Sequence, residues 1–369
     1  MAENMTRRAA VGRAVAVAAA GPAILSAQTN NVRVAVIGVG TRGSHVLRQT
    51  MKVPGVSIVA IADINPETLA RIGAEVQGGG HTPALYADFR KMLDERKDID
   101  AVIIATPVDT HKDIAIAALE VGKHVYLEKP MAITPEDCRL VTNAAAAAKG
   151  IFQMGFQLRH DPNRSAAVRY IQSGEAGPIL YAQGYRHTGD LPRETLWLFD
   201  RKRSGDNIVE QACHILDLFT WAIGKPPLRA MGSGGINLYK DVPPGRTTMD
   251  NYSVIYEFPG DIRVNFSHIY FDPRGFSGIK ERIYCANGAL DLTSATFYPL
   301  ERREPVKLEV PDAGQSADYL SAAAFIDNAR GKKTPLNNAP SARLSTLVAI
   351  LGRKAIEERR IVEWKEVDL

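Results

Sequence analysis

Short apolar runs alternate with helix-like segments over the first 156 residues. Val32–Ile37 and Val56–Ala62 are mostly apolar and rich in β-branched side chains, and similar runs follow at 101–105, 123–127 and 151–155. Such runs are typical of parallel strands that are buried on both faces. Asn-Pro and Thr-Pro pairs at 65–66 and 134–135 mark helix starts between them. Repeated strand–helix units predict an α/β fold, with a doubly wound, parallel Rossmann sheet over residues 31–156.

The pattern changes after residue 156. A helix is predicted at 162–172, and two more at 317–330 and 341–358 close the chain. Strand-like stretches lie between them, at 179–186, 228–234, 252–258, 262–270 and 281–286. Residues 263–269 alternate between polar and apolar side chains, which indicates a sheet with one covered face and one more polar face. We therefore expect a second α/β domain over residues 157–369, whose broad sheet face forms the interface of a homo-oligomer, a dimer or a tetramer.

A glycine-rich motif, Gly38-Val39-Gly40-Thr41-Arg42-Gly43, directly follows the first predicted strand. Asp63 lies 20 residues beyond its last glycine, at the end of the next strand. In this context the motif predicts a dinucleotide site, because Gly38 permits a tight turn, Gly40 lets the backbone approach a pyrophosphate, and Gly43 allows close packing of helix and strand. The N-terminus of the helix then faces the phosphates. Asp63 can bind the ribose hydroxyls, so we expect NAD, with NADP as the alternative because Arg42 lies in the loop.

The first 27 residues differ from the rest of the chain. They combine Arg7-Arg8 and Arg13 with an Ala/Val-rich run and small residues, a composition that predicts a signal for export to the periplasm, of the twin-arginine type. A disordered tail on a cytoplasmic protein is the alternative. The run is too short to span a membrane, and a net charge of +4 without a concentrated basic face argues against nucleic-acid binding. Three widely spaced cysteines predict neither disulfides nor a metal site.

Ligands of doubly wound sheets lie at the carboxyl ends of the strands. Two segments occupy such ends: Thr106-Pro107, with His111 shortly after it, and Glu128-Lys129-Pro130. Further motifs are Met154-Gly155-Phe156 followed by Arg159 and Asp161-Pro162, and Glu210 followed by His214 and Asp217. Together they resemble, in the same order, the motifs of the glucose-fructose oxidoreductase / inositol dehydrogenase (Gfo/Idh/MocA) family.

The resemblance implies a Rossmann domain followed by an α/β domain with a large, mostly antiparallel sheet. It also implies that a nicotinamide cofactor exchanges a hydride with a hydroxyl carbon of a sugar, inositol or related polyol. Lys129 corresponds to the family's catalytic or substrate-positioning lysine, and Glu210 and His214 to its acid–histidine pair. Many members have Asp where this chain has Glu210, whose side chain is longer. We expect the cofactor to contact Gly38, Gly40, Thr41, Arg42, Gly43, Asp63, Thr106, Pro107, His111, Glu128 and Lys129.

An alcohol that loses a hydride needs a base for its hydroxyl proton and a positive group beside the developing alkoxide. His214 can be the base and Lys129 the positive group. Glu210 precedes His214 by four residues, so we expect one helix to carry both on one face; an ordinary surface pair is the alternative. We also expect a cis bond between Lys129 and Pro130. The candidate substrate contacts are Arg159, His160, Tyr185 and Trp197, the first two with a structural salt bridge as the alternative.

The leading hypothesis is an exported, NAD(P)-dependent sugar or polyol dehydrogenase. One alternative is a glycoside hydrolase that uses tightly bound NAD to oxidise a sugar carbon transiently. The other is a non-catalytic binding protein of the same fold, against which the presence of Lys129 and His214 argues. Net turnover of free NAD separates the first two functions.

Overall fold

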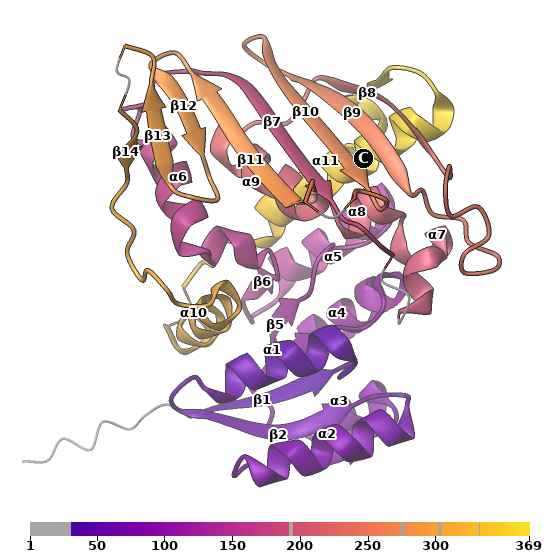
Figure 1. Cartoon of the computed structure of the whole chain (residues 1–369). Helices are drawn as coiled ribbons and strands as arrows, with labels where there is room; N and C mark the ends of the chain where they lie inside the picture. The colour runs from indigo at the N-terminus through magenta and orange to yellow at the C-terminus, as the bar shows by residue number, and fades with distance from the viewer. Residues whose placement is uncertain (1–30, 192–194, 274, 277, 302–303, 332) are drawn as a thin grey trace, which may run out of the picture.

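The computed structural model describes residues 31–191, 195–273, 275–276, 278–301, 304–331 and 333–369. The segment 1–27, for which we expect an export signal, lies outside these residues. The described chain contains a six-stranded and a nine-stranded sheet, with helices packed against both (Figure 1). The predicted α/β class with two sheets is therefore confirmed.

The six-stranded sheet has the order β3-β2-β1-β4-β5-β6, and every pair in it is parallel. Its strands are β1 (Val32–Ile37), β2 (Val56–Ala62), β3 (Ala84–Tyr86), β4 (Ala101–Ile104), β5 (His124–Leu127) and β6 (Phe152–Met154). The connecting helices are α1 (Thr41–Met51), α2 (Pro66–Gly78), α3 (Phe89–Glu95), α4 (His111–Glu120) and α5 (Pro135–Ala147). The strand order reverses between β1 and β4, so a crevice for ligands is expected at the carboxyl ends of these two strands.

The nine-stranded sheet has the order β14-β13-β12-β11-β7-β10-β9-β8-β15. Its strands are β7 (Ile179–His187), β8 (Arg229–Gly235), β9 (Asn251–Phe258), β10 (Ile262–Ile269), β11 (Gly278–Cys285), β12 (Gly288–Asp291), β13 (Thr296–Pro299), β14 (Val306–Lys307) and β15 (Val362–Glu363). Strands β7 and β10 pair in parallel, and the other neighbours pair antiparallel. The large, mostly antiparallel sheet that the resemblance implied is present.

In the part of the chain that the structure describes, helices cover one face of the nine-stranded sheet and not the other. They are α6 (Pro162–Gln172), α9 (Cys213–Ile223) and α11 (Ala339–Glu358), seen behind the strands in Figure 1. In β9 the side chains that face them, such as Val254 and Tyr256, are buried, whereas Ser253 and Ile255 on the other face are exposed. This alternation confirms the predicted division into a covered and a more polar face.

One helix of the C-terminal part packs against the first sheet. Phe325 and Ile326 of α10 (Ala317–Gly331) share a core with Val34 of β1 and Ile103 of β4. The main-chain oxygen of Ser321 accepts a hydrogen bond from Gln153, which lies in β6. Residues from the second predicted domain therefore complete the core of the first. No helix in the described part of the chain is long and apolar enough to cross a membrane.

Candidate active site

The glycine motif forms a turn that is open to a ligand at one position. Gly38 has a φ of +81°, and a Cβ there would lie 2.8 Å from the carbonyl oxygen of Ala105. A Cβ at Gly43, in the first turn of α1, would lie 1.9 Å from the Gly38 oxygen. At Gly40 a Cβ would meet no atom within 4 Å. Two glycines are thus required by the packing of the protein itself, and the space beside Gly40 fits a pyrophosphate group against the backbone.

Asp63 holds this turn in place. One carboxylate oxygen accepts a hydrogen bond from the main-chain N–H of Val39 at 2.8 Å, and the other accepts from the N–H of Asn65 at 2.8 Å. A carboxylate keeps further lone pairs after two such bonds, so Asp63 can still accept from ribose hydroxyls. The acid thus lies directly beside the glycine turn, at the end of β2.

Arg42 turns away from the loop and pairs with acids of the protein. Its guanidinium lies 2.8 Å from Glu128, at the end of β5, and 2.8 Å from Asp318 of α10. Glu128 is almost completely buried, and a Cβ at Gly155 would lie 2.9 Å from its carboxyl carbon. Arg42 therefore joins three elements and has its charge neutralised by two carboxylates. This arrangement disfavours a 2′-phosphate at Arg42, because the guanidinium would have to leave a buried partner.

Lys129 and Glu210 form a nearly buried ion pair. Lys129 Nζ lies 2.5 Å from Glu210 Oε1 and donates a second hydrogen bond, of 2.7 Å, to the main-chain oxygen of Glu210. The Lys129–Pro130 bond is cis, as expected. His111 fixes this segment, since its two ring nitrogens lie 2.8 Å from the Pro130 oxygen and 2.9 Å from the Thr106 oxygen. Residues at the ends of β4 and β5 are thereby joined to each other and to the second domain.

The prediction that one helix carries Glu210 and His214 is wrong. Glu210 ends α8 (Asn207–Glu210), and His214 lies in the first turn of α9. In a continuous helix the Glu210 oxygen would accept from the N–H of His214. Here it accepts from Lys129, 81 residues away in the sequence. The carboxylate of Glu210 also pairs with Lys129 and with the side chain of Gln211, so neither the expected pair with His214 nor a surface i,i+4 pair is formed.

His214 presents an unpaired nitrogen. The ring is partly exposed, but Nδ1 is buried and has no hydrogen-bond partner among the described residues. Burial lowers the pKa of His214 well below its usual value, and positive charges nearby lower it further, those of Lys129, Arg186, Arg42 and Arg164. The ring is therefore neutral at pH 7, and a proton acceptor with a free lone pair lies close to Lys129.

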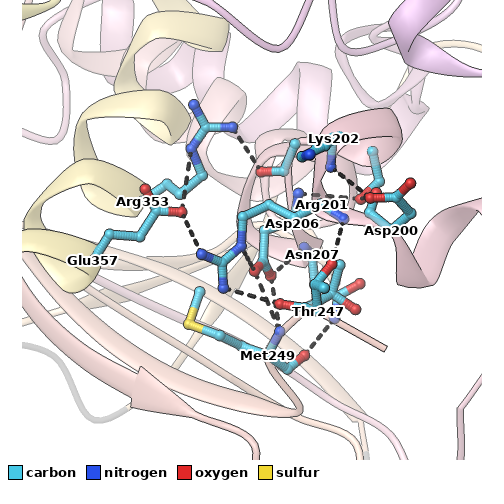
Figure 2. Close-up of polar contacts among 12 residues, drawn as sticks. Asp200, Arg201, Lys202, Asp206, Asn207, Thr247, Met249, Arg353 and Glu357 are labelled. Atoms are coloured by element: carbon cyan, nitrogen blue, oxygen red, sulfur yellow. Dashed lines mark hydrogen bonds and ion pairs between the residues drawn. The ribbon is translucent and has the colours of Figure 1, made fainter. Parts of the chain in front are cut away.

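A polar network joins α8, the loop after Lys129 and α11, and Figure 2 shows the part of it around Arg201, Asp206 and Arg353. Asp206, which caps α8, accepts hydrogen bonds from the N–H groups of Asn207 and Met249. Arg353 of α11 donates to the main-chain oxygen of Gly205 at 3.0 Å and to that of Ile133 at 3.0 Å. One arginine thus contacts the chain just before α8 and just after Pro130.

Of the four candidate substrate contacts, Arg159 and His160 lie in one 3-10 helix (Gln157–His160), whereas Tyr185 lies in β7 and Trp197 in another 3-10 helix. All three guanidinium nitrogens of Arg159 are used inside the protein, in a buried pair with Asp217 (2.6 Å) and in bonds to Leu336, Ser341 and Ser345. Arg159 therefore has the structural role that was its alternative. His160 is partly exposed, and its Nε2 has no partner among the described residues. Burial lowers its pKa to about 4.

Tyr185 and Trp197 have different surroundings. Tyr185 stacks on His187 at 4.3 Å, on the face of the nine-stranded sheet that no helix covers. Trp197 lies partly exposed in a short 3-10 helix, Leu196–Phe199. The residue next to Tyr185, Arg186, lies on the covered side of the sheet and acts on His214, and it was not among the predicted site residues. The signal was present, since Ala182, Gly184 and Arg186 alternate with Tyr185 along the strand.

Comparisons with known proteins agree with this architecture. The family model for the NAD-binding Rossmann fold of Gfo/Idh/MocA oxidoreductases matches residues 32–156, and the model for the C-terminal domain of the same family matches residues 165–291. The chain belongs to the Gfo/Idh/MocA family. Among the described residues of this family member, no group of three or more His, Cys, Asp or Glu side chains is arranged to hold a metal ion.

Individual relatives share part of the sequence. A scyllo-inositol 2-dehydrogenase (NAD(+)) of Bacillus subtilis is 32% identical over 209 residues, which are 56% of this chain and 58% of that protein. A glycosyl hydrolase family 109 protein of Saccharopolyspora erythraea is 33% identical over 42% of this chain and 35% of its own. The match thus spans little more than half of the first relative's length. The structure of a levoglucosan dehydrogenase in complex with NADH superposes with a TM-score of 0.78 at 20% identity, covering 90% of this chain and 99% of that one, which establishes the shared fold.

Proposed function

We propose that the protein is an NAD-dependent oxidoreductase that exchanges a hydride with a hydroxyl carbon of a sugar or polyol. The observation that carries the proposal is the arrangement of Lys129, Glu210 and His214 beside the open glycine turn. NAD, when bound there, would accept or return the hydride. The family membership and the NAD-dependent relative support the same activity.

The remaining chemistry belongs to the side chains of the chain itself. The neutral ring of His214 has a free nitrogen and can take the proton of the substrate hydroxyl. Lys129 has one ammonium hydrogen left after its two bonds to Glu210, and this hydrogen can be donated to the alkoxide oxygen. Glu210 holds the ammonium group in position and stays in contact with it throughout. In the reverse direction the same groups return the proton.

The proposal extends to the choice of cofactor. Asp63 offers carboxylate oxygens next to the glycine turn, where a 2′-phosphate would be repelled. Arg42, the basic residue of the motif, is committed to Glu128 and Asp318. Both features support NAD over NADP.

The test begins with purified protein without added cofactor. Absorbance and mass spectrometry detect bound NAD(H) or NADP(H), and a panel of sugars and polyols is followed at the absorbance band of reduced nicotinamide. We expect reduction of NAD by at least one panel member and its loss in Lys129→Met. Bound NAD that is not turned over, together with cleavage of aryl glycosides, would replace the dehydrogenase with the redox-type hydrolase. If the protein binds no dinucleotide even when NAD(H) or NADP(H) is added at saturating concentration, both the dehydrogenase and the hydrolase are refuted.

We further propose a homo-oligomer that associates through the uncovered face of the nine-stranded sheet. That face carries the exposed Ile255 and the half-buried, paired rings of Tyr181 and Tyr284, 5.7 Å apart. Light scattering on a size-exclusion column measures the mass, and Ile255→Lys should shift it to that of a monomer. Export through residues 1–27 is a separate prediction, which fractionation of producing cells checks.

A further inference from the structure

Arg186 lies at the carboxyl end of β7, on the face toward α9. A Cβ at Gly184, two residues earlier on that face, would lie 2.9 Å from the ring of Phe219 in α9. Arg186 is the next residue on that face of the strand, and its charge acts on His214 in the first turn of α9. In the parallel pair with β10 its partner is His268. Arg186 and His268 thus point together from the sheet toward the region of His214.

Several polar atoms in this place are buried and have no hydrogen-bond partner among the described residues. They are Arg186 Nε, His268 Nε2 and Tyr270 Oη, in addition to His214 Nδ1. The rings of His268 and Tyr270 lie 4.5 Å apart, and His268 is the partner of Arg186 in the neighbouring strand. Arg186, His268 and Tyr270 therefore form one cluster. The N–H of Tyr270 donates to Asp250, next to Met249, which contacts Asp206 at the start of α8. Because buried polar groups are normally paired, the cluster is suited to a polar ligand.

Among the basic residues that act on His214, all except Arg186 are paired with acids of the described chain. Of the four, Lys129 pairs with Glu210, and Arg42 pairs with Glu128 and Asp318. Arg164 pairs with Glu281 at 2.7 Å. Arg186 forms no ion pair or hydrogen bond with any residue that the structure describes. One positive charge is therefore left over on the substrate side of the site.

We infer that Arg186 binds a carboxylate of the substrate, so that the preferred substrates are sugar acids, such as uronates or aldonates, and not neutral polyols. The inference rests on the proposed oxidoreductase function and narrows its substrate class. A guanidinium presents two parallel N–H groups that match the two oxygens of a carboxylate. A single unpaired cation balances a monoanion, which favours a carboxylate over the dianionic phosphate of a sugar phosphate.

The experiment uses the full chain saturated with NADH and measures binding by calorimetry. Matched probes are D-glucuronate against D-glucose, D-galacturonate against D-galactose, and D-glucose 6-phosphate. We expect at least one uronate to bind about tenfold to a hundredfold more tightly than its neutral partner, and Arg186→Met to remove this preference. The control is Arg139→Met, which removes an exposed guanidinium of α5 that pairs with Glu136.

Equal binding of each acid and its neutral sugar would overturn the inference, as would a preference that survives Arg186→Met or tighter binding of the phosphate. None of these results would affect the proposed function, provided that a neutral sugar still reduces NAD. Loss of the acid preference in Arg186→Met with unchanged NADH affinity would support the assignment. Failure to bind NADH would instead contradict the function itself.

Discussion

Arg353→Met tests whether α11 positions the catalytic pair. Arg353 donates two hydrogen bonds of 3.0 Å, to the main-chain oxygens of Gly205 and Ile133. Its side chain is 15% exposed, and methionine would fill a similar apolar volume. The partner acid Glu357 keeps a contact with Arg201 at 3.2 Å, so its charge is not left alone. The substitution therefore removes mainly two charge-assisted hydrogen bonds.

The magnitude follows from these two bonds. A hydrogen bond to a charged group contributes about 1.5–3 kcal/mol, so Arg353→Met should lower the free energy of unfolding by about 3–6 kcal/mol. Ile133 lies four residues after Lys129, and Gly205 lies five residues before Glu210. Loss of the shared anchor should let the two segments move apart. A misplacement of about 1 Å costs on the order of a hundredfold in rate, so kcat should fall by about tenfold to a hundredfold.

The assay separates the two effects with a control from the same helix. Arg343 of α11 bonds to Asp368 and Leu369 near the C-terminus and contacts neither site loop. Urea unfolding gives the stability of Arg353→Met and Arg343→Met, and kcat is measured where both variants are folded. We expect both to be less stable, and only Arg353→Met to lose kcat. Unchanged kcat in folded Arg353→Met would refute the positioning role.

Three further outcomes are expected. Lys129→Met should lower kcat by at least about a hundredfold with NADH affinity nearly unchanged, since it removes the ammonium group beside the alkoxide. Steady-state kinetics measure kcat, and NADH fluorescence measures the affinity. A retained kcat would contradict the assignment. Asp63→Ser should weaken NAD binding by about tenfold and narrow the gap to NADP, because the ribose acceptor and the bond to Val39 are both weakened; titration of each dinucleotide measures it. Because burial lowers the pKa of His160 to about 4, its neutral form is favoured by folding, and stability is lost as pH falls from about 6.5 toward 4. Between pH 8 and pH 5, His160 lowers the free energy of unfolding by at most about 2 kcal/mol. The urea midpoint should therefore fall over this pH range, and it should fall less steeply in His160→Gln.

Local patterns were sufficient for the first sheet and its loop. The strands at Val32–Ile37 and Val56–Ala62 have the predicted bounds. A nearly continuous apolar run is typical of a parallel strand that is buried on both faces. The glycine turn was predicted from the motif and its place between strand and helix, although the contacts that require Gly38 and Gly43 include Ala105, which only folding brings close. The nearness of Lys129 to Glu210 was implied by the family resemblance alone. No spacing in the sequence predicts it.

The side chains of the second domain were harder to place, for two physical reasons. For Arg159 both a substrate contact and a structural salt bridge stayed open, because its partner Asp217 lies 58 residues away and is brought to it only by folding. Tyr185 was chosen for its ring, although a shift of one residue along a strand reverses the face. Its neighbour Arg186 lies on the same face of the strand as the buried residues Ala182 and Gly184. The alternation along β7 therefore places Arg186, and not Tyr185, on the face that the helices cover.

The break between α8 and α9 is a departure from regular helix geometry at the candidate active site. Residues 207–223 have the pattern of one helix, and a continuous helix would bond the Glu210 oxygen to the N–H of His214. The break gives up that bond, and the oxygen accepts instead from Lys129, whose ammonium group is charged. A charge-assisted bond is about twice as strong as a neutral one, so the exchange offsets the loss. Lys129 is thereby held by a carbonyl and a carboxylate of the same residue, an arrangement that an uninterrupted helix cannot provide.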